Sequence, residues 1–79
     1  MAYTVTETTA YLNYFDEVDI LTEGVQDAIH GSTYIFERLE WAQNFAKAYA
    51  SQIDALYVED GQNCPMLKAG QTLVQVKDA

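Results

Sequence analysis

Apolar and aromatic side chains recur every three or four positions through residues 25–57, and no proline interrupts the segment. This spacing places them on one face of an α-helix, because a helix completes a turn every 3.6 residues or so. The series comprises Val25, Ala28/Ile29, Ile35/Phe36, Leu39, Ala42, Phe45/Ala46, Tyr49, Ile53 and Leu56/Tyr57. Gly31-Ser32 is its weak point, since glycine costs about 1 kcal/mol relative to alanine inside a helix. We expect one continuous helix over residues 25–57, with a break at Gly31-Ser32 as the alternative.

Shorter elements are expected at both ends of the chain. Residues 3–6 are rich in β-branched side chains and predict a strand, whereas apolar residues over 7–15 are spaced helically. Thr6 can cap this second, shorter helix. Residues 72–76 partly alternate and predict an edge strand that could pair antiparallel with residues 3–6.

The polar segment 59–63 and Pro65 predict the end of the long helix, because turn-forming residues and proline do not continue a helix interior. The 79 residues are enough for a single domain, spanning residues 1–79. The expected fold is therefore α+β but mainly helical: one long helix, a shorter N-terminal helix and short terminal strands.

Composition favours a folded chain that needs a partner. Hydrophobic residues make up 49% of the chain and aromatic residues 13%, which is typical of globular proteins rather than disordered ones. So short a chain has few segments to cover the apolar stripe of a long helix. We expect another protein chain to cover it, either in a homo-oligomer or from a neighbouring protein.

Acidic residues dominate the first half of the sequence. Residues 1–37 contain no lysine or arginine, and the whole chain has a net charge of −8. Nucleic-acid binding depends on cations that replace condensed counterions, so direct binding to DNA or RNA is not expected. No signal segment or membrane-spanning apolar run is apparent either. The expected partners are proteins, not membranes, and these features predict a soluble, intracellular protein.

Candidate catalytic chemistry is sparse. His30 follows Asp27 by three residues, a spacing at which a carboxylate could orient an imidazole for acid–base work or metal binding. It is the only histidine, and Cys64, the only cysteine, has no recognisable base beside it. We therefore predict no enzyme activity, no catalytic residue, no cofactor and no metal site, and we expect alanine at either position to preserve function.

Two groups of residues are candidates for protein contacts. Four acidic residues have three- and four-residue spacings, which would line one helix face if the long helix began early; that face is either solvated or docks a basic partner. A calcium site is disfavoured because no alternating ligand loop with its glycine is present. Aromatic residues offer large contact areas at small entropic cost, and too few cations accompany them for base stacking. The predicted protein-interface residues are Tyr34, Arg38, Trp41, Asp16, Asp19, Glu23 and Asp27.

Residues 3–41 also resemble the head-to-tail connector proteins of tailed phages, sometimes described as DnaT-like. The matching segments are Thr4-Val5-Thr6-Glu7-Thr8-Thr9-Ala10-Tyr11-Leu12, Leu21-Thr22-Glu23, Gln26-Asp27-Ala28-Ile29 and Ser32-Thr33-Tyr34-Ile35-Phe36-Glu37-Arg38-Leu39-Glu40-Trp41. In that family a similar opening leads through an acidic turn to a helix. The chain departs from the pattern at Ala42-Gln43, where a glycine usually follows the tryptophan, and the resemblance assigns nothing after Ser51.

The resemblance implies a non-enzymatic structural protein of a phage particle, a head-to-tail connector or adaptor subunit that forms a ring between portal and tail. It also implies a location in the virion or the host cytoplasm. Acidity suggests an alternative: a small phage-encoded inhibitor that mimics DNA, in the manner of an anti-CRISPR protein, and occupies a basic groove on a host defence protein. An assembly protein should depend more on Trp41 and Tyr34 than on the acidic residues. A DNA mimic should show the opposite order.

Overall fold

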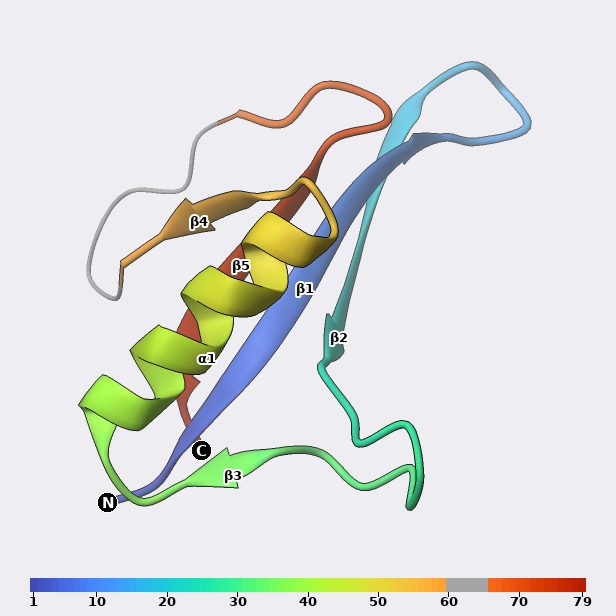
Figure 1. Ribbon diagram of the computed structural model, residues 1–79. Coiled ribbons are helices and arrows are strands. Elements are labelled where there is room, and N and C mark those ends of the chain that lie inside the picture. Colours follow the sequence, from blue (N-terminus) through green and yellow to red (C-terminus); the bar gives the residue numbers. More distant parts are fainter. Residues whose placement is uncertain (60–65) are drawn as a thin grey trace.

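A computed structural model describes residues 1–59 and 66–79 of the chain (Figure 1). In chain order the elements are β1 (Tyr3–Leu12), β2 (Val18–Gly24), β3 (Ile35–Phe36), α1 (Leu39–Gln52), β4 (Leu56–Val58) and β5 (Thr72–Asp78). Strand accounts for 42% of the structure and helix for 19%. The expectation of a mainly helical fold is therefore wrong. The chain is an α+β protein in which a five-stranded mixed sheet carries one helix on one face.

The sheet is built around β1, which pairs along both of its edges. The main strand order is β2-β1-β5-β4, and β3 pairs with the start of β1 on the same side as β2. β1 is antiparallel to β2, β3 and β5, whereas β4 and β5 run parallel. The predicted antiparallel pairing of residues 3–6 with residues 72–76 is confirmed, with Val5 opposite Val76 and Thr6 opposite Gln75. The prediction that residues 72–76 form an edge strand is wrong, because β4 pairs with the other side of β5.

The short helix expected over residues 7–15 does not form. Residues 7–12 belong instead to β1, and Tyr14 and Phe15 lie in the turn that joins β1 to β2. Threonine is a better strand former than helix former because its branched side chain is restricted in a helix. Thr8 and Thr9 therefore extend the predicted strand, and neighbouring strands on both sides supply its backbone hydrogen bonds.

The long helix expected over residues 25–57 is also wrong, since α1 covers only its middle. Gly31 has a positive φ of 71°, and the Asp27 carboxylate accepts hydrogen bonds from the backbone N–H groups of Ile29 and His30. Such a side-chain turn competes with helix formation. Residues 26–33 consequently form a loop closed by a bridge between Gln26 and Thr33.

At its other end, α1 stops well before Tyr57. Asp54 takes a left-handed conformation, with φ of 56°, one residue after the C-cap Ile53. The N–H of Ala55 then donates to the carbonyl oxygen of Ala50 at 2.8 Å, and the N–H of Asp54 donates to the carbonyl oxygen of Ser51 at 3.4 Å. These two bonds form a Schellman motif, which ends a helix and reverses the chain. The reversal leads directly into β4.

Replacing Asp54 with glycine should raise the free energy of unfolding by about 0.5 kcal/mol. A left-handed conformation is strained for residues with a Cβ atom and free of strain for glycine, although glycine also has more freedom to lose on folding. Asp54 is exposed, so few contacts are removed. Urea denaturation measures the change, with the exposed helical Ser51→Gly, which should destabilise, as the control. A loss of stability for Asp54→Gly would contradict this account of the helix end.

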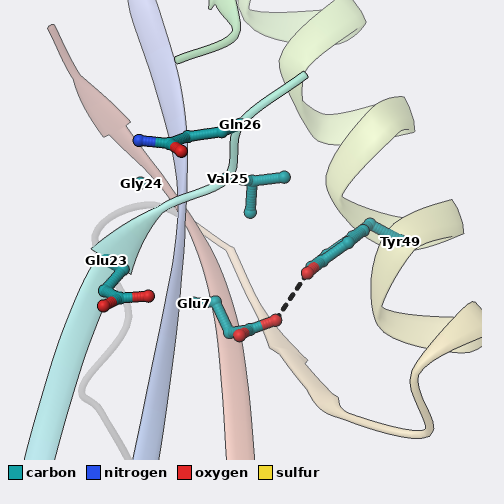
Figure 2. A pocket seen from close by; sticks show the side chains of 6 residues that line it. All are labelled: Glu7, Glu23, Gly24, Val25, Gln26 and Tyr49. Carbon is teal, nitrogen blue, oxygen red and sulfur yellow. Dashed lines mark hydrogen bonds between the residues drawn. The ribbon is translucent and has the colours of Figure 1, made fainter. Parts of the chain in front are cut away.

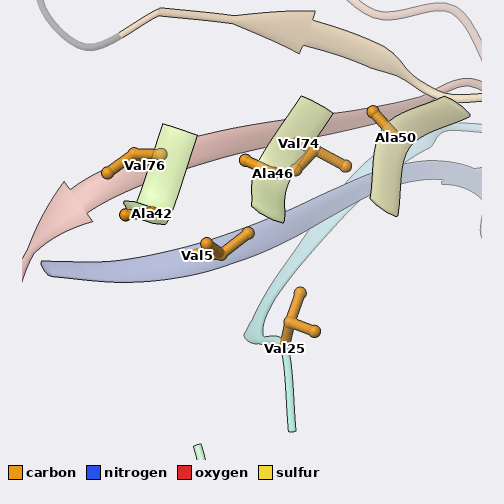
Figure 3. Close-up of a cluster of buried hydrophobic side chains, with 7 residues drawn as sticks. All are labelled: Val5, Val25, Ala42, Ala46, Ala50, Val74 and Val76. Carbon is orange, nitrogen blue, oxygen red and sulfur yellow. The ribbon is translucent and has the colours of Figure 1, made fainter. Parts of the chain in front are cut away.

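The core lies between α1 and the central strands (Figure 3). Three alanines spaced four residues apart, Ala42, Ala46 and Ala50, face the sheet and are buried. On the sheet side the largest fully buried side chains are Val5, Val74 and Val76, and Val25 completes this cluster. Small side chains on the helix allow it to approach the strands closely. An aromatic group formed by Tyr34, Phe36, Phe45 and Tyr49 packs against this core.

The opposite face of the sheet is only partly covered. Leu67 packs there against Ala10, Val58 and Leu73, in a second and smaller buried cluster. The segment that carries Leu67 is tied to β1 by hydrogen bonds between Ala10 and the residues Gly70 and Gln71. Within the described residues no helix has the length and apolar content required to cross a bilayer.

Candidate functional site

Exposed apolar side chains gather on the hairpin formed by β1, β2 and the turn between them. This hairpin projects beyond the helix-covered part of the sheet (Figure 1). Seven of its large hydrophobic residues are between 44% and 94% exposed: Tyr11, Leu12, Tyr14, Phe15, Val18, Ile20 and Leu21. Tyr11 and Leu21 lie on the face of the hairpin toward α1, Leu12, Val18 and Ile20 on the opposite face, and Tyr14 and Phe15 in the turn. Single exposed apolar residues are ordinary, but so many on one hairpin typically mark an interaction surface.

Hydrogen bonds to Asn13 hold the turn of the hairpin in place. Its side-chain oxygen accepts from the backbone N–H groups of Phe15 and Glu17, at 2.8 and 3.0 Å. Its amide nitrogen donates to the Asp19 carboxylate at 3.1 Å. Asp16 completes the turn with a positive φ of 60°. The result is an ordered tip in which the Tyr14 and Phe15 rings meet edge to face, with their centroids 5.5 Å apart.

An acidic cleft lies between the hairpin and α1 (Figure 2). It has a volume of about 520 Å³ and is lined by Glu7, Glu23, Gly24, Val25, Gln26 and Tyr49. Glu7 and Glu23 are directly opposite each other on β1 and β2, where like charges are unfavourable. The cleft is therefore suited to a cationic group.

Tyr49 reaches into this cleft from α1 and binds Glu7. Its O–H donates to Oε1 of Glu7 at 2.6 Å, a short, charge-assisted hydrogen bond. This bond, together with partial burial and the negative charge of Glu7, raises the pKa of Tyr49 to about 12. Tyr49 therefore keeps its proton, and acts as a donor, up to a higher pH than an ordinary tyrosine does. The pair links the helix to the centre of the sheet.

The four acidic residues predicted to share one helix face are arranged differently. Asp19 and Glu23 lie on one face of β2, the face that also carries Glu7 of β1. Asp16 is in the hairpin turn, and Asp27 is in the loop that follows β2. The structure thus keeps Asp19 and Glu23 on a common face and adds Glu7, which sequence reasoning missed. A period-two reading of β1, in which Val5 and Glu7 share a face, would have found it.

Asp27 and His30 do meet, as their spacing suggested, but in a turn and not on a helix. Nδ1 of His30 lies 3.0 Å from Oδ2 of Asp27, and the histidine side chain is 74% exposed. The hydrogen bond with His30, followed by that from the N–H of Ile29, lowers the pKa of Asp27. Among the described residues no three potential ligands cluster to hold a metal ion. Cys64 lies outside the described residues.

The predicted aromatic interface residues separate into two environments. Tyr34 is half-buried, and its ring centroid is 4.6 Å from that of Phe45, so it contributes to the core. Trp41 is 52% exposed near the start of α1. The guanidinium of Arg38 lies 5.1 Å from the Trp41 ring centroid, a cation–π distance. Trp41 and Arg38 thus remain available at the surface, whereas the contacts of Tyr34 are largely internal.

No family model, curated protein or solved structure matches this chain. The resemblance to phage connectors placed a helix over the matching residues 28–41. In the structure residues 28–34 lie in a loop and an isolated bridge, Ile35–Phe36 forms β3, and the helix begins only at Leu39. The helical part of the resemblance therefore has little counterpart in the fold.

Proposed function

We propose that this chain is a non-enzymatic assembly protein that contacts neighbouring proteins through the β1–β2 hairpin. The observation that carries the proposal is the group of exposed apolar residues at positions 11–21, on an ordered hairpin that projects from the sheet. Tyr14 and Phe15 at its tip are 94% and 74% exposed. Burying one such aromatic side chain contributes about 1.5–3 kcal/mol, so a partner that covers the tip gains substantial affinity.

The finer assignment is a head-to-tail connector or adaptor of a tailed phage. Its support is the sequence resemblance over residues 3–41. In such an assembly each subunit would reach its neighbour through the hairpin, and Trp41 with Arg38 would supply a second contact. Many repeated small interfaces then give a stable ring, because each contact raises the effective concentration of the next.

A DNA-mimicking inhibitor is the second candidate. It is supported by Glu7, Asp19 and Glu23, which share one face of the hairpin. Residues 1–37, which include this hairpin, contain no lysine or arginine. The carboxylates on such a face could take the place of DNA phosphates in a basic groove. Long-range electrostatic attraction would also speed the association of this face with the groove. The two candidates differ in what they require: an assembly protein needs the apolar tip, whereas a mimic needs the carboxylates and competes with DNA.

A double alanine substitution at Tyr14 and Phe15 tests the proposal. When this chain is co-expressed with the other structural proteins of the phage that encodes it, the assembled particles should contain the wild-type chain in a fixed ratio to the other subunits. The double variant should be incorporated at least about tenfold less, because truncating a central aromatic contact typically costs 2 kcal/mol or more. Quantitative mass spectrometry of purified particles measures the ratio.

Ile29→Ala is the matched control, since Ile29 is 86% exposed but lies outside the hairpin. Its incorporation should match the wild type. Circular dichroism should show that the double variant stays folded. Two results would contradict the proposal: undiminished incorporation of the double variant, or recovery of the chain only in a complex from which DNA displaces it. The second result would favour the inhibitor.

A further inference from the structure

We propose that the outer edge of β2 binds a β-strand from a different protein, one in which lysine or arginine alternates with apolar residues. This inference rests on the proposed function and defines the chemistry of a partner. β2 is the terminal strand of the sheet, and all its residues except Gly24 are exposed. Edge strands of this length commonly accept another strand by backbone pairing.

The backbone groups that a partner would use belong to Val18, Ile20 and Thr22. At one end of β2 the N–H of Val25 donates to the carbonyl oxygen of Val5. At the other end the N–H of Asn13 donates to the carbonyl oxygen of Glu17. In an antiparallel pair, hydrogen-bonded positions occur at every second residue. The odd-numbered residues of β2 therefore bond to β1, and the N–H and C=O groups of the even-numbered residues point outward.

Side chains along this edge alternate in character between the two faces of the sheet. Val18 and Ile20 lie on the face away from α1, beside an open cavity of about 500 Å³ that Met66 and Leu73 also line. Asp19 and Glu23 lie on the face toward α1, where they flank Leu21. Directly paired residues of neighbouring strands share a face. A complementary strand must therefore place apolar side chains beside Val18 and Ile20, and basic ones beside Asp19 and Glu23.

Within residues 1–59 and 66–79, the carboxylates on β2 have no cationic partner. The ion pairs of the described residues join His30 to Asp27 and Arg38 to Glu40, so neither Asp19 nor Glu23 takes part in one. Glu23 instead faces Glu7. A lysine or arginine opposite Glu23 would offset this like-charge contact. Natural edge strands are commonly protected by lysine, proline or a bulge, and β2 contains no lysine or proline.

A second copy of the chain fits this edge poorly. In a two-fold antiparallel pair centred on Leu21, which uses all seven residues of β2, Asp19 lies opposite Glu23 of the other copy. A pair centred on Ile20 places Glu17 opposite Glu23 instead. Both arrangements oppose like charges in a chain of net charge −8. Charge complementarity thus favours a basic strand over self-association.

Synthetic peptides test the pairing directly. A peptide of alternating lysine and valine should bind and should shift the backbone amide signals of Val18, Ile20 and Thr22 in an NMR titration. A peptide of the same composition, with its lysines in one block, should bind at least about threefold more weakly. N-methylation of alternate residues in the first peptide removes its backbone donors and should weaken binding to a similar extent, since one net hydrogen bond corresponds to about a three- to tenfold change. An alternating glutamate and valine peptide should not bind.

Two variants identify the edge. Ile20→Pro removes an outward N–H, a position at which an edge strand tolerates proline, and should weaken binding of the alternating peptide by about tenfold. Ile20→Thr keeps the N–H and should weaken binding less. Asp19→Asn with Glu23→Gln should lower affinity and reduce its dependence on salt. The amide spectrum of each variant verifies that the hairpin is intact.

Several results would overturn the inference. Equal binding of the alternating, block and N-methylated peptides would show attraction by charge alone. A stable dimer by light scattering that Ile20→Pro dissociates would make a second copy the occupant. If the peptides fail to pair with β2 while the Tyr14 and Phe15 substitutions still impair assembly, the inference fails and the proposed function stands. If the peptides pair specifically with β2 but the chain never enters particles, the proposed function fails and the pairing of β2 with a basic strand stands.

Discussion

Replacing Ala46 with leucine is expected to lower the free energy of unfolding by about 1–3 kcal/mol, the typical effect of inserting extra methylene groups into a packed core. Ala46 has no exposed surface and occupies the middle of the three-alanine row that faces the sheet (Figure 3). Val5 and Val74, on the strands in the same buried cluster, are also fully buried. A larger side chain must therefore push α1 away from the strands or take a strained rotamer.

Urea denaturation followed by circular dichroism measures this change, with Ala48→Leu as the matched control. Ala48 is on the same helix but exposed, and leucine is nearly as good a helix former as alanine. The control should stay within about 0.5 kcal/mol of the wild type. If Ala46→Leu unfolds at the same urea concentration as the wild type, then α1 does not pack closely on the sheet through its alanines.

The predicted helix forms only where the local sequence and the packing against the core both favour a helix. Ala42, Phe45, Ala46 and Tyr49 continue the predicted apolar face, and all belong to α1 and contact the core. Ile29 and Ile35 satisfied the same spacing, yet they are 86% and 58% exposed. Periodicity alone could not reveal that the Asp27 side chain and the positive φ of Gly31 make residues 27–31 a turn. These two residues were the local signals against a continuous helix.

Sheet pairing was predicted only at the ends of the chain. The β-branched residues of 3–6 and 72–76 were recognised as strands, and their antiparallel pairing is confirmed. The extension of β1 to Leu12 was missed because Ala10 and Tyr11 also fit a helical spacing with Tyr14. Strand formation there depends on β2 and β5, which pair with β1 across long sequence separations. Contacts of this kind override local propensity.

The candidate site was predictable in its chemistry but not in its geometry. The excess of acidic residues is evident from composition, and the expectation of a protein partner remains a prediction. The placement of Glu7 opposite Glu23, and of Tyr49 beside them, depends on the register of β1 with β2 and on the packing of α1. Likewise, the apolar residues at 11–21 gather on one hairpin only because residues 13–17 turn the chain back on itself.

Replacing Tyr49 with phenylalanine should lower the free energy of unfolding by about 1–2 kcal/mol at neutral pH. Hydrogen bonds to charged groups contribute about 1.5–3 kcal/mol, and the partial exposure of this pair reduces that value. The substitution leaves the Glu7 carboxylate without the Tyr49 hydroxyl, while the aromatic ring and its stacking on Phe45 are retained. Tyr14→Phe, at a 94% exposed position, is the matched control and should change stability by less than about 0.5 kcal/mol.

The difference between wild type and Tyr49→Phe should depend on pH in one direction. The Tyr49 pKa is raised from its ordinary value of 10.0 to about 12 in the folded chain, so the unfolded chain loses this proton more readily. The stabilisation is therefore fully present below pH 10 and declines as the pH rises through about 12. Urea denaturation at several pH values between 8 and 12 should show the two proteins converging. A difference that stays constant across this range would mean that the hydroxyl stabilises the fold by some contact other than its proton shared with Glu7.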